Sequence, residues 1–157
     1  MPNRSAPEIA APALSDTLRE KLRILIDSFR RLTGGELLAN ATPESLWTAP
    51  RVIVAHGTED DPIFFYGNAL ALDVFAMDFT RFTHLPSRYS AEAPRRDERA
   101  RLLDRVRRDG YIDDYSGIRI AADGRRFRIE QAVVWNLIDA SGALHGQAAT
   151  FTHWTPL

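Results

Sequence analysis

Leucine and phenylalanine recur every three or four residues near the start of the chain, and this spacing predicts an amphipathic helix. Residues at such steps share one face of a helix. Ser15 or Thr17 can cap the helix through its side chain, and the glycine pair that begins at Gly34 can end it. We therefore expect the helix within residues 15–35, preceded by a disordered tail over residues 1–14, which contain three prolines. The apolar stripe consists of Leu18, Leu22, Leu25, Phe29 and Leu32.

Strand-like runs of apolar, β-branched and aromatic residues dominate the last third of the chain. They predict three strands over residues 111–120, 126–138 and 145–154, joined by two tight turns that each contain a glycine. Further upstream, residues 52–55 and 63–66 have the composition of a short hairpin. Together these runs predict a sheet of five strands.

Short helical segments lie between the hairpin and the last three strands. Asn68 can cap a helix over residues 69–77 by accepting a hydrogen bond from a backbone N–H group. Asp78 can cap the next turn, residues 79–85, in the same way. A basic helix over residues 94–109 then leads into the three-strand meander.

This order of elements is typical of PAS-type sensor domains. We therefore predict an α+β protein with a PAS-like five-stranded antiparallel sheet, short helices on one face and the amphipathic N-terminal helix. The PAS-like domain is expected over residues 42–157. Both faces of the strand at 126–138 carry apolar residues, so both faces of the sheet should be covered. The N-terminal helix, from the same chain or from a partner, is the expected second cover.

Composition narrows the class of protein. The chain has 157 residues, which fits one domain, and its net charge of −1 does not favour nucleic acid or an anionic membrane. No run approaches the roughly 20 apolar residues that span a bilayer, and no apolar secretion signal is present. We therefore expect a cytoplasmic protein. The absence of cysteine excludes disulfides, thiolate metal sites and thiol chemistry.

Candidate catalytic and metal-binding groups are sparse. None of the four histidines lies three or four residues from another, so no helical metal-ligand pair exists. Asp113 and Asp114 are adjacent on a predicted strand and should point to opposite faces, which prevents a shared proton. We therefore predict no catalytic residue and no metal site. A small enzyme stays open as an alternative only if His56, His84, Tyr66 or Glu130 converge in a cavity.

Several short stretches together resemble a known family. They are His-Gly-Thr at 56–58, Asp-Pro-Ile-Phe at 61–64, Tyr-Gly-Asn at 66–68, Leu-Pro-Ser-Arg at 85–88, the segment 110–117, the segment 124–130, Val-Trp-Asn at 134–136 and His-Gly-Gln-Ala at 145–148. The chain resembles the MEKHLA domain, a PAS-related family found as stand-alone bacterial proteins and at the C-terminus of plant class-three homeodomain–leucine-zipper transcription factors. The resemblance implies sensing by a stand-alone bacterial member without naming a signal, and no plant DNA-binding module accompanies it.

The resemblance also bears on cofactors. PAS relatives that form a covalent flavin or chromophore adduct need a cysteine, so such an adduct is excluded here, whereas non-covalent flavin binding stays open. Haem-binding PAS proteins usually take an axial histidine from the helix before the meander, and residues 94–109 contain none. Haem is therefore not expected, and the identity of any cofactor is unknown.

Alignment of the turn near residue 140 with the matching PAS turn places one face of the long strand toward the interior. Buried charges on that face must pair with each other or meet a polar ligand, because an isolated buried charge is costly. A shift of the strand by one residue would invert the whole assignment. The candidate pocket residues are Tyr66, Tyr115, Arg119, Arg128, Glu130, Asn136, Gln147 and Phe151.

We therefore expect a PAS-like sensory domain that binds a small molecule non-covalently and signals through contacts with an unknown protein partner. A homodimer is also expected, with the N-terminal apolar stripe as the candidate interface. The alternative is a ligand-free module for protein interaction or dimerisation. The basic helix carries seven arginines but no interleaved aromatic residue, so we interpret it as a solvated face, not a nucleic-acid surface.

Overall fold

The computed structural model describes residues 7–91 and 96–157 of the chain. The predicted start of the basic helix, at residues 94–95, and part of the predicted tail lie outside these ranges. The elements, in chain order, are α1 (Asp16–Thr33), β1 (Val52–His56), β2 (Phe64–Gly67), α2 (Ala69–Phe75), α3 (Phe79–Phe82), η1 (Ser87–Ser90), α4 (Arg96–Asp109), β3 (Tyr111–Ile120), β4 (Arg126–Ile138), β5 (Leu144–Phe151) and β6 (His153–Pro156).

All strands join one antiparallel sheet in the order β2-β1-β5-β4-β3, and β6 pairs with the first half of β4. The first hairpin therefore lies beside the last long strand. The predicted final strand is divided at Thr152 into β5 and β6. The α+β class and the antiparallel sheet with short helices are confirmed, with one short strand more than expected.

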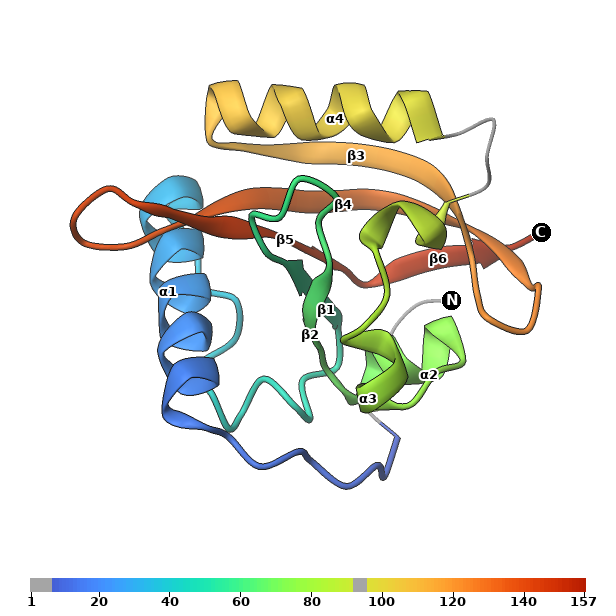
Figure 1. Cartoon of the computed structure of the whole chain (residues 1–157), viewed down its shortest axis with the longest axis horizontal. Coiled ribbons are helices and arrows are strands. Elements are labelled where there is room, and N and C mark those ends of the chain that lie inside the picture. The colour runs from blue at the N-terminus through green and yellow to red at the C-terminus, as the bar shows by residue number, and fades with distance from the viewer. Residues whose placement is uncertain (1–6, 92–95) are drawn as a thin grey trace.

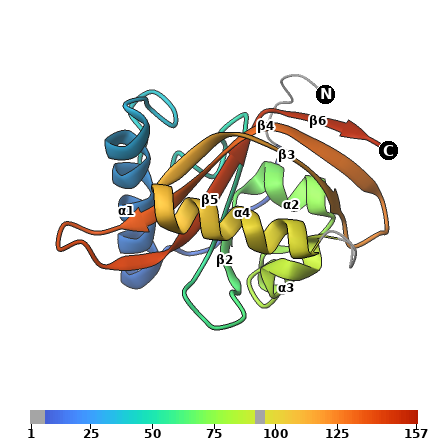
Figure 2. The ribbon, with the colours of Figure 1, turned by 90° about the horizontal axis from the view of Figure 1, so that it is seen from above.

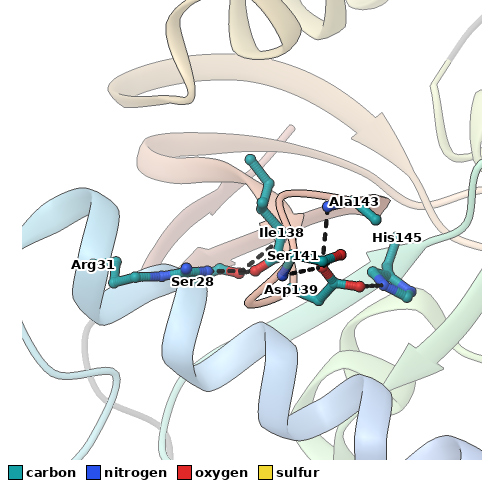
Figure 3. Close-up of polar contacts among 7 residues, drawn as sticks. All are labelled: Ser28, Arg31, Ile138, Asp139, Ser141, Ala143 and His145. Carbon is teal, nitrogen blue, oxygen red and sulfur yellow. Dashed lines mark hydrogen bonds and ion pairs between the residues drawn. The ribbon is translucent and has the colours of Figure 1, made fainter.

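Helix α1 covers one face of this sheet and stands apart from the other helices in Figure 1. The rings of Phe29 and Trp135 meet edge to face, with centroids 4.9 Å apart, and the Trp135 indole donates to the carbonyl of Leu25 at 3.2 Å. Ser28 bonds both the N–H and the carbonyl of Ile138, and Arg31 donates to the same carbonyl (Figure 3). The helix is thus fixed to the sheet by packing and by hydrogen bonds.

The apolar stripe of α1 therefore faces the sheet of its own chain. Leu22, Leu25 and Phe29 are buried in the main core, and Leu18 and Leu32 are half-buried against it. These side chains were the candidate dimer interface. Their packing within one chain leaves them no free apolar face for a second copy.

The remaining helices cover the opposite face. Figures 1 and 2 show α2 and α3 together beside the first hairpin, and α4 running alongside β3. Phe75 of α2 packs edge to face on Phe127 of β4, with ring centroids 5.4 Å apart, and Phe82 of α3 stacks on Phe64 of β2 at 4.3 Å. The core thus has two layers of side chains, one on each face of the sheet.

Asn68 connects β2, β1 and α2 at a fully buried position. Its side-chain oxygen accepts from the backbone N–H groups of Ile53 and Ala71, both at 3.1 Å. Its amide nitrogen donates to the carbonyls of Leu46 at 3.0 Å and Arg51 at 2.8 Å. The predicted helix cap is therefore also the hydrogen-bond partner of two chain segments that lie beside it.

Strand β4 contains a β-bulge at Gln131, which has a φ of 50°. Between the pairs Tyr115↔Ala132 and Gly117↔Ile129, β4 contributes one residue more than β3. The extra residue turns the side chains that follow it to the other face of the sheet. As a result, Ile129, Ala132 and Val134 all face the α4 side, whereas Trp135 faces α1.

The segment before α1 forms no helix or strand from residue 7 to residue 15. It nevertheless lies against the domain, because the indole N–H of Trp47 donates to the carbonyl of Ile9 at 2.7 Å.

Candidate functional site

The sheet, α2, η1 and α4 leave a cavity of about 60 Å³ between them. Most of its lining is apolar and comes from β1, β4, β5 and α4. Polar side chains also reach it, and these are His56, Ser90, Tyr115, Arg119 and Gln147. Pockets for drug-sized ligands typically measure about 300–1,000 Å³. This cavity is therefore suited to a molecule of only a few atoms.

Half of the predicted pocket residues meet here. Tyr115, Arg119, Gln147 and Phe151 line the cavity. Asn136 lies behind Gln147, whose amide nitrogen donates to the Asn136 side-chain oxygen at 3.1 Å. The second half of β4 and the neighbouring strands thus have the orientation that the sequence predicts.

Two side-chain amides connect the cavity wall to α4. Asn136 donates to the carbonyl of Val106 at 3.0 Å, and Gln147 donates to the carbonyl of Leu103 at 3.3 Å. Both carbonyls belong to the C-terminal half of α4. Because one amide group of Gln147 contacts α4, Asn136 and the cavity, its orientation depends on all three.

The prediction was wrong for Arg128 and Glu130, which are exposed on the other face of β4. The bulge at Gln131 is the reason, because it reverses the facing of the residues that precede it relative to those that follow. Arg128 and Glu130 instead line a shallow surface depression with Gln131 and His153.

Tyr66 lies in a different part of the core. Its ring meets those of Trp47 and Phe79 edge to face, with centroids 6.3 and 6.1 Å away. Burial in this aromatic cluster raises the pKa of the Tyr66 hydroxyl. Tyr66 does not line the cavity.

Two cavity residues, His56 and Ser90, are absent from the predicted ligand pocket. His56 ends β1, one residue beyond the predicted strand at 52–55, and its Nδ1 atom lies 3.0 Å from the carbonyl oxygen of Gly57. Ser90 ends η1 and donates to the carbonyl of Ser87 at 2.7 Å. The apolar run before His56 could have extended the predicted strand by one residue, but nothing in the local sequence distinguishes Ser90.

A separate polar network holds the turn between β4 and β5 (Figure 3). One carboxylate oxygen of Asp139 accepts from the N–H and hydroxyl of Ser141 and from the N–H of Ala143. The other oxygen lies 2.7 Å from Nε2 of His145. The hydroxyl of Ser141, then His145 and the N–H of Ala143, hold the pKa of the Asp139 carboxyl well below its usual range.

This network predicts a pH dependence of stability. The folded pKa of Asp139 lies below its ordinary value of 3.8, so its contribution is present above that value and is lost as pH falls below it. We expect urea denaturation to show a stability gap between the wild type and Asp139→Asn at pH 7 that narrows toward pH 2.5. The exposed Asp60→Asn serves as the control. A gap that stays constant over this pH range would contradict the prediction.

Two further features concern metals and membranes. Within residues 7–91 and 96–157, no three histidine, aspartate or glutamate side chains gather in a way that could hold a metal ion. In the same ranges no helix combines the length and the apolar character that crossing a bilayer requires.

Comparison with known sequences gives a family match and several plant relatives. The MEKHLA domain family matches residues 19–156. The homeobox-leucine zipper protein HOX10 of Oryza sativa subsp. indica is 21% identical over 139 residues, which cover 85% of this chain and 17% of that protein. ATHB-14 of Arabidopsis thaliana is 22% identical over 163 residues, covering 98% of this chain and 19% of that protein. The chain thus spans less than a fifth of these relatives.

Comparison with solved structures gives similar folds at low sequence identity. The light-state dimer of the fungal blue-light photoreceptor Vivid has a TM-score of 0.61 at 12% identity, covering 92% of this chain and 98% of that one. A PAS domain from Colwellia psychrerythraea has a TM-score of 0.55 at 12% identity, covering 64% and 82%. A LOV protein of Rhodobacter sphaeroides has a TM-score of 0.58 at 8% identity, covering 85% and 66%. At these identities the likeness concerns the fold alone.

Proposed function

The chain belongs to the MEKHLA domain family and has a PAS-like fold, and from that premise we propose that it is a sensory domain that binds a small molecule non-covalently. The binding site is the cavity between the sheet and α2, η1 and α4. The observation that supports it is the convergence of polar side chains in an otherwise apolar, largely buried space. A well-formed apolar cavity with a few convergent polar groups is the usual form of a ligand site.

The hydrogen bonds between the cavity wall and α4 suggest how ligand binding in the cavity is transmitted to the surface of the protein. Gln147 lines the cavity and donates to the Leu103 carbonyl of α4. A ligand that accepts a hydrogen bond from this amide competes with the helix for the same donor. We infer that binding weakens the attachment of α4 and that a protein partner contacts the displaced helix.

Two properties of the protein restrict the chemistry and the size of the ligand. The chain contains no cysteine, so no thiol adduct forms. The cavity, at about 60 Å³, holds only a few heavy atoms in the conformation described. The ligand is therefore a small molecule and not an extended cofactor such as a flavin.

A ligand-free module for protein interaction is the second candidate, and the small cavity volume favours it. The fungal photoreceptor Vivid is described as a dimer in its light state, which supports a homodimer here. Since Leu22, Leu25 and Phe29 are buried against their own sheet, the dimer must use a surface other than the α1 stripe.

Native mass spectrometry of the protein purified from cells separates the two candidates. We expect a bound species that is lost on denaturation. Ala149 lines the cavity, so Ala149→Leu fills it and should reduce the bound fraction, whereas the exposed Ala143→Leu should not. If all three proteins show the mass of the polypeptide alone, the interaction module is favoured and the ligand-binding proposal fails.

A further inference from the structure

We propose that the ligand of this cavity is a short-chain monocarboxylate, and that Arg119 binds its carboxylate group. This inference depends on the proposed function, because it assigns a chemical class to the molecule that occupies that site.

The first observation is that Arg119 is buried without a carboxylate partner. Its side chain lies on β3 and the residue is 7% exposed. Nη1 donates to the carbonyl of the adjacent Ile118 at 2.9 Å. Among the described residues, no carboxylate oxygen lies within 4.0 Å of its nitrogens. A guanidinium has five N–H donors, so most of its binding capacity remains available for a ligand.

Arginines on the surface of the protein provide a contrast. Arg19, Arg30 and Arg88 each pair with a carboxylate although all three are better solvated than Arg119. A charge that leaves water needs a counter-charge more than one that stays in it. The cavity lining contains no aspartate or glutamate among the described residues, so the counter-charge must arrive with the ligand.

The second observation is that the guanidinium is held in place before any ligand binds. Its carbon atom lies 5.2 Å from the centre of the Tyr115 ring, within the range of a cation–π contact. The Tyr115 ring lies over Gly117, where a Cβ atom would approach the tyrosine hydroxyl oxygen to 2.0 Å. Gly117 therefore makes room for Tyr115, which positions Arg119. Planar guanidinium groups bind carboxylates in a two-point geometry, and a fixed orientation favours this.

The third observation is the size and polarity of the remaining space. A volume of about 60 Å³, at roughly 10–15 Å³ for each water-sized group, holds about four to six heavy atoms. A carboxylate accounts for three of these. Val54, Ile129 and Val134 line the cavity and offer apolar contacts to the rest of the molecule. A short alkyl chain fits this part, whereas a second charged group would meet no compensating side chain.

Titration of the purified full chain with propionate, followed by isothermal calorimetry and by amide chemical shifts, tests the inference. We expect saturable binding of one propionate per chain and no binding of propionamide, its neutral analogue of nearly equal shape. Arg119→Gln should weaken propionate binding by about ten- to a hundredfold, the usual effect of losing hydrogen bonds to a charged group. Arg128→Gln, which removes an exposed arginine on the neighbouring strand, should leave it unchanged.

The outcomes separate this inference from the proposed function. Equal binding of propionamide and propionate, or equal affinity in Arg119→Gln, overturns the carboxylate assignment but leaves a ligand site in the cavity. Absence of propionate binding also overturns the assignment, and the bound species seen by native mass spectrometry then decides separately whether the cavity holds a ligand. If Arg119→Gln does not fold, the comparison of the two ligands on the wild type still decides the inference.

Discussion

Replacing Gly146 with alanine is expected to be among the most destabilising single changes in this protein. An added Cβ atom at this position would lie 1.9 Å from the backbone carbonyl oxygen of His56, and the residue has a φ of 139°. Neither backbone can move away without separating β1 from β5, which pair beside this point. We expect a loss of about 4 kcal/mol or more in the free energy of unfolding, measured by urea denaturation.

Gly142→Ala provides the matched control. Gly142 also has a positive φ, 88°, but nothing lies within 4 Å of its Cβ position. Its replacement should therefore cost only the backbone strain, about 1 kcal/mol. If the two substitutions cost the same, the contact between Gly146 and His56 does not limit the pairing of these strands. Because His56 and Gln147 both line the cavity, Gly146→Ala should also reduce ligand binding in any population that folds.

Asn68→Ala is expected to have an effect of similar size for a different reason. The substitution leaves two backbone N–H groups and two carbonyls without their side-chain partner at a fully buried position. Each unsatisfied buried group costs about 1–3 kcal/mol, so the loss of four partners should lower the free energy of unfolding by roughly 4 kcal/mol or more. Thermal and urea denaturation, followed by circular dichroism, measure this loss.

Asp78→Ala is the control for Asn68, because both residues cap a short helix. The Asp78 side chain is exposed and accepts from the N–H of Arg81 at 2.7 Å. Its loss should cost about 1 kcal/mol, the usual value for a cap. Similar losses for the two variants would mean that Asn68 acts only as a helix cap and that its bonds to β1 and to the carbonyls contribute little.

Features set by neighbouring residues could be predicted from the sequence. The stripe of α1 and the cap at Asn68 follow from spacing and from one side chain near a backbone N–H group. The element order was sufficient to predict the antiparallel sheet. The sequence of α1 alone could not show what its apolar stripe packs against. An apolar helix face can pack on a sheet as well as on a partner helix. The contact between Phe29 and Trp135 decides this in favour of the sheet.

The candidate site could be predicted only in part, because the facing of the side chains along β4 could not be derived from the sequence. Side chains alternate strictly along a strand only if no residue is inserted. A positive φ is uncommon for glutamine, so nothing at Gln131 indicated the bulge. The prediction therefore placed Asn136 on the inward face, where the structure also has it, and misplaced Arg128 and Glu130. His56 and Ser90 were not assigned to the ligand pocket because segments distant in the sequence bring them to the cavity.

The same bulge contributes to the empty space in the interior. In an unbroken alternation, the face that holds Phe127 and Ile129 would also receive the indole of Trp135. The insertion directs that large ring beneath α1 and leaves the methyl group of Ala132 and the short side chain of Val134 beside the void. The empty space thus depends on this backbone irregularity together with small lining residues such as Ala132, Ala148 and Ala149.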